Sequence, residues 1–215
     1  WRQAFAGKWN VKTRSGGPGE QLRLSGRANK SARRVGCTQG DKDLDKRIIG
    51  IVCGTRPEII KLAPVYHALR QREELCVLWV HTGQHGDMAA DMLRCFGIAP
   101  DVQLRRTGAS LEAFSLECRA QLDELMSRRR WDLCIVQGDT ESAFLGALSA
   151  FYRRVPVAHV EAGLRTYNLE RPFPEEGLRQ MISRLACMQF APTERARAAL
   201  LREGVEPEKI LLTGN

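Results

Sequence analysis

The stretch RIIGIVC at residues 47–53, followed at once by GTRPE at residues 54–58, decides the fold. The first run is short and almost entirely apolar, which is typical of a strand buried on both faces of a parallel sheet. Thr55 and Glu58 have the spacing of a helix capping box, and Pro57 suits the first turn of a helix. The two runs together predict a buried strand, a glycine turn and a helix that begins without a linker.

A helix that begins at the carboxyl end of a parallel strand offers free backbone N–H groups to an anion. Arg56 adds a guanidinium group at this junction, and Lys61 lies about one helical turn further on. This combination suits a phosphorylated ligand. An ordinary capped helix with a solvated arginine explains the junction equally well, so the rest of the chain has to decide between the two interpretations.

From residue 47 to the end, short apolar runs alternate with segments of helical periodicity. This alternation predicts an α/β fold: a doubly wound parallel sheet with helices on both faces. Right-handed crossovers place the carboxyl ends of all the strands at one edge of the sheet. Ligands bind outside this edge. Strands are expected at residues 47–53, 75–82, 102–104, 132–137, 156–160, 188–191 and 210–212. After the helix that follows GTRPE, further helices are expected at residues 86–96, 110–129, 140–152, 175–186 and 193–202.

Residues 1–46 form a basic tail that is rich in Gly, Ser, Arg and Lys and has no sustained periodicity, so we predict that it is disordered. The tail holds 11 of the 33 Lys and Arg residues and 4 of the 25 Asp and Glu residues, which leaves 22 basic and 21 acidic residues for the domain at 47–215. The net charge of +8 therefore belongs mainly to the tail, and no nucleic-acid partner is expected for the domain. A targeting peptide and an accidental reading of upstream sequence are both compatible with the tail.

The chain has neither an apolar stretch near the roughly 20 residues that span a bilayer nor a signal peptide. We therefore expect no membrane insertion and a cytoplasmic location. The 7 cysteines are scattered without a CxxC pair. This pattern is typical of reduced, buried thiols, and it predicts no zinc or other metal site.

Charged side chains gather where the predicted strands end. Three carboxylates and four basic residues follow these strands or the loops behind them, so we expect them to meet at one edge of the sheet. Acids and bases together in one crevice suit proton transfer on an anionic ligand. Taken singly, each has a structural explanation, such as capping a helix or lying in a solvated loop. The residues are Asp139, Glu161, Glu175, Arg56, Lys61, Arg165 and Arg179.

Several motifs at these strand ends carry a resemblance to a known family. The chain is similar to the non-hydrolysing UDP-N-acetylglucosamine (UDP-GlcNAc) 2-epimerases from residue 47 to residue 215, without large gaps. The motifs occur in order along the whole of this range, which makes the resemblance specific. They are GTRPE (54–58) with Lys61, TGQH (82–85), QGDT (137–140), HVEAGLRT (159–166), PFPEE (172–176) with Arg179, and TGN (213–215).

The resemblance implies an activity and a set of roles. The family converts UDP-GlcNAc to the N-acetylmannosamine (ManNAc) epimer, in cell-envelope polysaccharide synthesis, by eliminating UDP and adding it back, without a cofactor. It implies acid/base roles for Asp139, Glu161 and Glu175. It implies ligand binding by the four basic residues Arg56, Lys61, Arg165 and Arg179. Gln84 and His85 match part of a regulatory UDP-GlcNAc site, although Gly86 and Asp87 depart from the pattern expected next to them.

The resemblance also implies an architecture. Family members have two Rossmann-like domains that face one another, as in B-type glycosyltransferases, and are expected to form homodimers. The resemblance covers only the first domain, so the second domain and most of the uridine pocket are expected to be missing from residues 1–215, which should have little activity alone. A B-type glycosyltransferase domain and a non-catalytic remnant that binds nucleotide sugars or dimerises are the alternatives.

Overall fold

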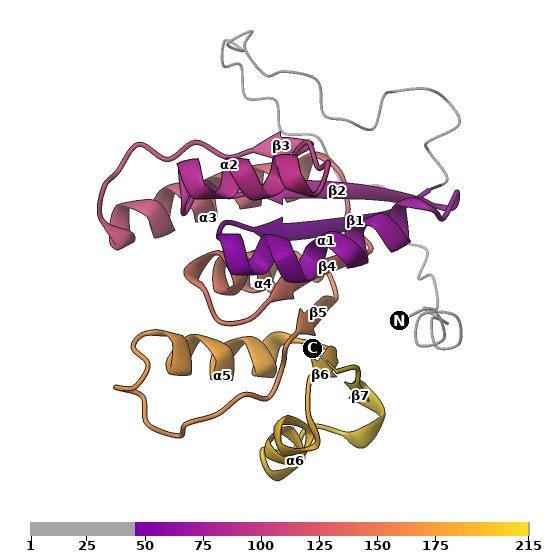
Figure 1. The fold of residues 1–215 in the computed structure, drawn as a ribbon, viewed down its shortest axis with the longest axis vertical. Helices are drawn as coiled ribbons and strands as arrows, with labels where there is room; N and C mark the ends of the chain where they lie inside the picture. Colours follow the sequence, from indigo (N-terminus) through magenta and orange to yellow (C-terminus); the bar gives the residue numbers. More distant parts are fainter. Residues whose placement is uncertain (1–45, 215) are drawn as a thin grey trace, which may run out of the picture.

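The computed structural model describes residues 46–214, except for the side chains of residues 86–88. The predicted disorder of residues 1–46 therefore falls, apart from Lys46, outside the described residues. Within residues 46–214, seven strands form one sheet, and six helices and a short 3-10 helix connect them (Figure 1). The strands are β1 (Arg47–Cys53), β2 (Leu75–His81), β3 (Val102–Gln103), β4 (Leu133–Gln137), β5 (Val157–Val160), β6 (Met188–Ala191) and β7 (Ile210–Leu212). The helices are α1 (Arg56–Arg70), α2 (Gly86–Cys95), α3 (Leu111–Arg128), α4 (Glu141–Tyr152), α5 (Glu175–Leu185), α6 (Glu194–Arg202) and the 3-10 helix η2 (Pro207–Lys209).

The sheet is parallel throughout and doubly wound, as the sequence predicts. Its strand order is β3-β2-β1-β4-β5-β6-β7. The chain first builds outward from β1 to β3, then returns to place β4 on the other side of β1 and continues to β7. The direction of winding thus changes between β1 and β4, and this is where sheets of this kind bind their ligands.

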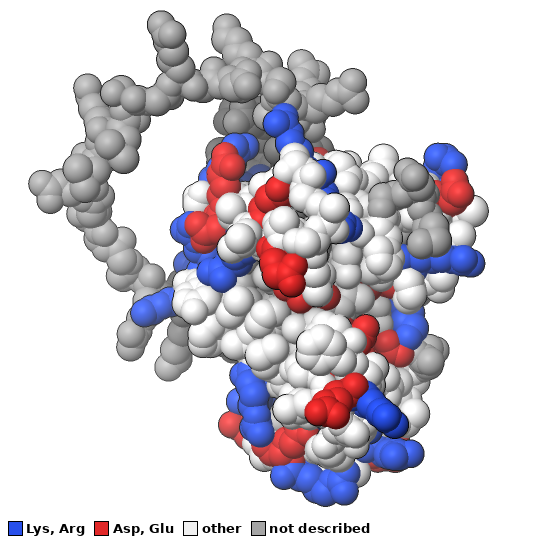
Figure 2. Space-filling view, turned by 90° about the vertical axis from the view of Figure 1, so that its left-hand side faces the viewer, with Lys and Arg blue, Asp and Glu red and all other residues white. Residues whose placement is uncertain are grey.

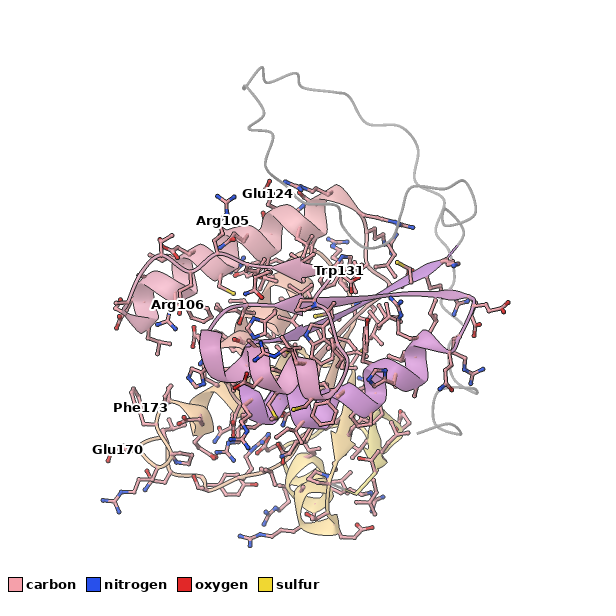
Figure 3. All side chains as sticks on the ribbon, turned by 45° about the horizontal axis from the view of Figure 1, so that its top comes forward. Arg105, Arg106, Glu124, Trp131, Glu170 and Phe173 are labelled. Carbon is pink, nitrogen blue, oxygen red and sulfur yellow. The ribbon has the colours of Figure 1, made fainter. Side chains whose placement is uncertain are left out.

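Alternate residues of β1 face two separate hydrophobic cores, one on each face of the sheet. Ile49 and Ile51 pack with the buried residues of α1 and α2, whereas Ile48 and Val52 pack with those of α3 and α4. Gly50 lies on the second face, against the ring of Trp131. Trp131 is buried and is labelled in Figure 3. A Cβ atom at Gly50 would lie 2.0 Å from that ring, so only glycine fits this position.

The predicted bounds of strands and helices agree with the structure to within one residue at each end. Several helices begin one residue late because the first predicted residue is the N-cap. Ser110, Thr140 and Thr193 each accept a hydrogen bond from the backbone N–H three residues later. No helix in the described part of the chain is both long and apolar enough to cross a bilayer.

Among the described cysteines, all but one are free thiols, as expected, although Cys95 is exposed and not buried. Cys53, Cys118 and Cys134 are buried free thiols, and Cys95 and Cys187 are also free. Burial raises the pKa of Cys118 and Cys134 to about 12, so these thiols are unreactive. Cys76 is disulfide-bonded, and the expectation is wrong for this residue.

Candidate active site

The turns that follow β1, β2, β4 and β5 lie at the carboxyl edge of the parallel sheet. Figure 2 looks onto this side of the molecule, where acidic and basic side chains are interspersed and neither sign dominates. The candidate site is therefore of mixed charge, unlike the uniformly basic surface expected of a simple polyanion-binding protein.

A buried carboxylate, that of Glu58, joins the turn after β1 to the turn after β4. Its Oε2 accepts hydrogen bonds from the backbone N–H groups of Gly54 and Thr55, at 2.9 and 2.7 Å. Its Oε1 accepts one from the Thr140 hydroxyl, at 2.8 Å. Burial raises the pKa of Glu58, and these hydrogen bonds oppose that shift by stabilising the ionised form. The start of α1 and the start of α4 are thus fixed to one another.

Asp139 lies just before α4 and pairs with Arg179, which comes from α5. The distance from Arg179 Nη2 to Asp139 Oδ2 is 3.2 Å. Burial raises the pKa of Asp139, and Arg179 opposes that rise. The charges of Glu161 and Glu175 raise this pKa further, while Lys61 lowers it. The structure therefore brings all three predicted carboxylates and two of the predicted cations into electrostatic contact.

Glu161 lies directly after β5, and both of its carboxylate oxygens are occupied. Lys61 Nζ donates to Oε1, and Gln137 Nε2 donates to Oε2. The backbone of Glu161 has φ 64°, in the left-handed region. A residue with a side chain is uncommon there, at a cost of about 1–3 kcal/mol, and such residues cluster at functional sites.

Two glutamates begin α5 and have different surroundings. Glu175 is half-buried beside Asp139, whose pKa it raises. Glu176 is buried and accepts hydrogen bonds from the backbone N–H groups of Thr166 and Tyr167, both at 3.0 Å. Glu176 therefore fixes the loop between β5 and α5. The outer part of that loop, with Glu170 and Phe173, is exposed at the surface (Figure 3).

Two predicted ligand-binding arginines lie in opposite environments. Arg56 is exposed at the first position of α1. The Arg165 side chain is buried, and all three of its nitrogens donate within the chain, to Glu203, to Ser183 and to its neighbour's carbonyl oxygen. The Arg165 side chain thus stabilises the loop after β5 by binding to Glu203 and Ser183. Direct contact of Arg165 with a ligand remains a prediction.

The predicted regulatory pair lies after β2. The Gln84 side-chain oxygen accepts hydrogen bonds from both the backbone N–H and the hydroxyl of Ser142, at 3.1 and 2.6 Å. His85 is exposed, and its backbone N–H donates to Gly54 O at 2.9 Å. The carboxamide of Gln84 is therefore engaged with α4, and the regulatory role of both residues stays a prediction.

Three residues of this site have contacts that the motifs alone did not reveal. Gln137 holds Glu161, Glu58 joins two turns as well as capping a helix, and Glu176 anchors a loop. Gln137 offered one usable signal, because a polar residue that ends a buried strand faces the ligand edge. Among the described residues, no group of three or more His, Cys, Asp or Glu side chains is placed to hold a metal ion.

The fold and the charged edge define a Rossmann-like domain with paired carboxylates and cations at its switch point. The family model described as UDP-N-acetylglucosamine 2-epimerase matches residues 67–215. The chain belongs to this family.

Curated relatives with the same family name are similar in sequence to this chain over 76% of its length. The chain is 44% identical over 170 residues to a UDP-N-acetylglucosamine 2-epimerase of Yersinia pestis and 41% identical to one of Escherichia coli. In both cases 76% of this chain is matched, but only 44% of the relative. The chain thus spans a little under half the length of the curated relatives it matches.

Solved structures with the same fold include two that were determined with ligands. The Staphylococcus aureus MnaA–UDP co-structure has a TM-score of 0.75 and 42% identity, over 79% of this chain and 45% of that one. The Neisseria meningitidis UDP-GlcNAc 2-epimerase bound to UDP-GlcNAc has a TM-score of 0.74 and 37% identity, over 79% and 46%.

Proposed function

We propose that this chain is the amino-terminal half of a non-hydrolysing UDP-GlcNAc 2-epimerase, active when joined to a second Rossmann-like domain. The observation that supports this most strongly is the convergence of Asp139, Glu161 and Glu175 with Lys61 and Arg179 at the switch point of the sheet. A domain that only bound a nucleotide sugar would need the cations but not three neighbouring carboxylates.

The chemistry explains why both kinds of group are required. The proton on C2 of the sugar is not next to a carbonyl group, so its direct removal is very unfavourable. If the bond from C1 to UDP breaks first, positive charge develops at C1 and makes the C2 proton acidic. Its loss gives a 2-acetamidoglucal, and re-addition of UDP with a proton from the opposite face inverts C2. The reaction has no net redox change and calls for no nicotinamide.

The residues divide between these tasks according to their surroundings. Asp139, Glu161 and Glu175 would move protons at C2, on the two faces of the sugar. Arg56, exposed at the start of α1, would bind the diphosphate, which must be held after it leaves C1, because the backbone N–H groups of Gly54 and Thr55 already donate to Glu58. Lys61 and Arg179 would support the same anion while also pairing with Glu161 and Asp139. Arg165 would act indirectly, by supporting the loop after β5.

The partners we propose follow from the same resemblance. The ligands are UDP-GlcNAc and UDP, as named for two of the similar structures. The homodimer is proposed from the family resemblance alone. Gln84 and His85 would contribute to a regulatory site only if a ligand can reach beside the Ser142 contact. The proposed location is the cytoplasm, where nucleotide sugars are made and used.

Conversion of UDP-GlcNAc to UDP-ManNAc by a full-length chain tests the proposal. Residues 1–215 are joined to the remainder of the Yersinia pestis relative, and the product is followed by NMR; we call this protein the restored chain. We expect equilibration of the two epimers. UDP binding without conversion would contradict the proposal and favour a binding remnant, and transfer of the sugar to an acceptor would favour a glycosyltransferase.

A further inference from the structure

We propose that Gln137 is a positioning residue that fixes the carboxylate of Glu161 for proton transfer, an inference that rests on the proposed function. Gln137 is the last residue of β4, and its side chain is buried. Its Nε2 donates to Glu161 Oε2, while Lys61 Nζ donates to Oε1. Each oxygen of the carboxylate therefore has its own donor.

The two donors differ in how firmly they fix direction. The Lys61 side chain is 34% exposed, and an ammonium group on a flexible stem acts as a point charge with rotatable donors. Gln137 is 3% exposed and is held at the end of a strand, so its planar amide has one orientation. We infer that the positive charge of Lys61 stabilises the ionised carboxylate of Glu161, whereas the amide of Gln137 fixes the orientation of that carboxylate.

The backbone makes this support necessary. Gln137 and Val160 are register partners on adjacent strands. Because Glu161 directly follows Val160, the backbone pairing alone places Gln137 and Glu161 close together. Glu161 then adopts its left-handed φ of 64°, and the neighbouring Gly138 has φ 70°. A Cβ atom at Gly138 would lie 3.7 Å from Glu161 Oε2, so the carboxylate lies over this glycine. Sparsely populated backbone conformations persist only where surrounding contacts determine them, and Gln137 provides such a contact.

The expected consequence of losing Gln137 is a slower reaction with unchanged binding. A base misplaced by ~1 Å can lose about 100-fold in rate. The Gln137→Met variant keeps the length and burial of the side chain but removes the donor. We expect its kcat in the restored chain to fall by roughly 10- to 100-fold, while the affinity for UDP stays within about twofold.

Gln189→Met is the matched control. Gln189 is also a buried glutamine in a strand, at the second position of β6, and its Nε2 donates to Ser183 O at 2.8 Å. The same chemical change there removes a buried hydrogen bond that does not reach a carboxylate of the site. A structural effect of losing a buried amide would appear in both variants, as a lower midpoint of thermal unfolding. An effect on kcat at constant UDP affinity should appear only in Gln137→Met.

A second measurement needs no catalysis. In the 215-residue chain, the side-chain amide protons of Gln137 should be shifted downfield and exchange slowly in NMR spectra, and Glu161→Ala should abolish both features without changing those of Gln189. If Gln137→Met keeps kcat within about twofold of a wild-type restored chain that is active, or if Glu161→Ala leaves the Gln137 signals unchanged, the inference is wrong. An inactive wild-type restored chain would instead count against the proposed function, and the NMR result would still decide whether Gln137 holds Glu161.

Discussion

Arg179 Nη2 lies 3.2 Å from Asp139 Oδ2, and Arg179 Nε lies 3.4 Å from the buried carboxylate of Glu176. One guanidinium group thus connects the turn after β4 to the anchor of the loop before α5. Because Arg179 also lowers the pKa of Asp139 against the effect of burial, it sets the protonation of a carboxylate that we place in the reaction.

Replacing Arg179 by Met should raise the pKa of Asp139, because burial and the charges of Glu161 and Glu175 would then act with less opposition. The limb of the pH–rate profile that reports Asp139 should move to higher pH, whichever protonation state is the active one. A ¹³C NMR titration of Asp139 in the 215-residue chain measures the change directly. Arg197→Met, which removes a surface pair with Glu194, serves as the control and should leave the titration unchanged.

His159 should make the domain less stable in mild acid. The ring of His159 is buried, and its Nε2 lies 2.7 Å from Gly138 O. Burial lowers the pKa of His159 from the ordinary value of 6.5 to about 4. Between pH 6.5 and pH 4, His159 therefore binds a proton in the unfolded chain but not in the folded one. The free energy of unfolding has its full value above pH 6.5 and falls as the pH decreases towards 4.

By pH 5 this effect amounts to about 2 kcal/mol, at 1.36 kcal/mol per pKa unit. Urea unfolding at pH 7.5 and pH 5 should show the loss in the wild type and a smaller one in His159→Gln, which keeps an N–H donor for Gly138 but does not titrate. Equal losses in the two proteins would show that His159 is not the source. His67→Gln, at an exposed position, serves as the control.

Gly163 should tolerate no side chain. It has φ 87°, and a Cβ atom there would lie 2.3 Å from the carbonyl oxygen of Ala196 in α6. We expect Gly163→Ala to lower the free energy of unfolding by about 2–4 kcal/mol, through strain and steric overlap. Gly177 is the opposite case, because it lies within α5 and no atom lies within 4 Å of the position that a Cβ atom would occupy. Gly177→Ala should therefore stabilise the domain by about 0.5–1 kcal/mol. Urea unfolding of both variants compares them, and a Gly163→Ala variant as stable as the wild type would contradict the described packing.

Residues 1–215 alone should show little or no epimerase activity. Their matched part, 170 residues, corresponds to 44% of the length of the Yersinia pestis relative, and the sugar and uridine need the rest of the cleft to hold them in register. The measurement is interconversion of UDP-GlcNAc and UDP-ManNAc by the purified 215-residue chain. Turnover near 1 per second, within the usual enzyme range of about 1–1000 per second, would contradict this expectation.

The fold could be predicted from the sequence because its local signals agree with one another. The apolar run of β1, the GTRPE turn and the N-caps Ser110, Thr140 and Thr193 each fix a boundary without reference to distant residues. Parallel topology then follows from the alternation of strands and helices. The bounds were predicted closely for this reason, and not because any single segment was strongly helical.

The site was predictable in outline and not in detail. Strand ends indicate which residues reach the ligand edge, and this was enough to predict that Asp139 and Glu161 lie near one another, while their roles stay predictions. The position of Arg165 depends on Glu203, which follows α6 and has no sequence relationship to it. The contact of Gln137 with Glu161 depends on a left-handed φ at a glutamate, which no propensity would indicate.

The most direct test of the proposed mechanism is solvent deuterium incorporation at C2 of UDP-GlcNAc by the restored chain, in the wild type and in Glu161→Gln. Gln keeps the shape of the side chain and removes the base, which typically contributes about 100- to 10,000-fold. We predict that Glu161→Gln loses exchange by a factor in this range while its affinity for UDP, measured by calorimetry, is largely retained. Undiminished exchange in the variant would remove Glu161 from the mechanism, and equal losses of exchange and affinity would make it a binding or structural residue instead.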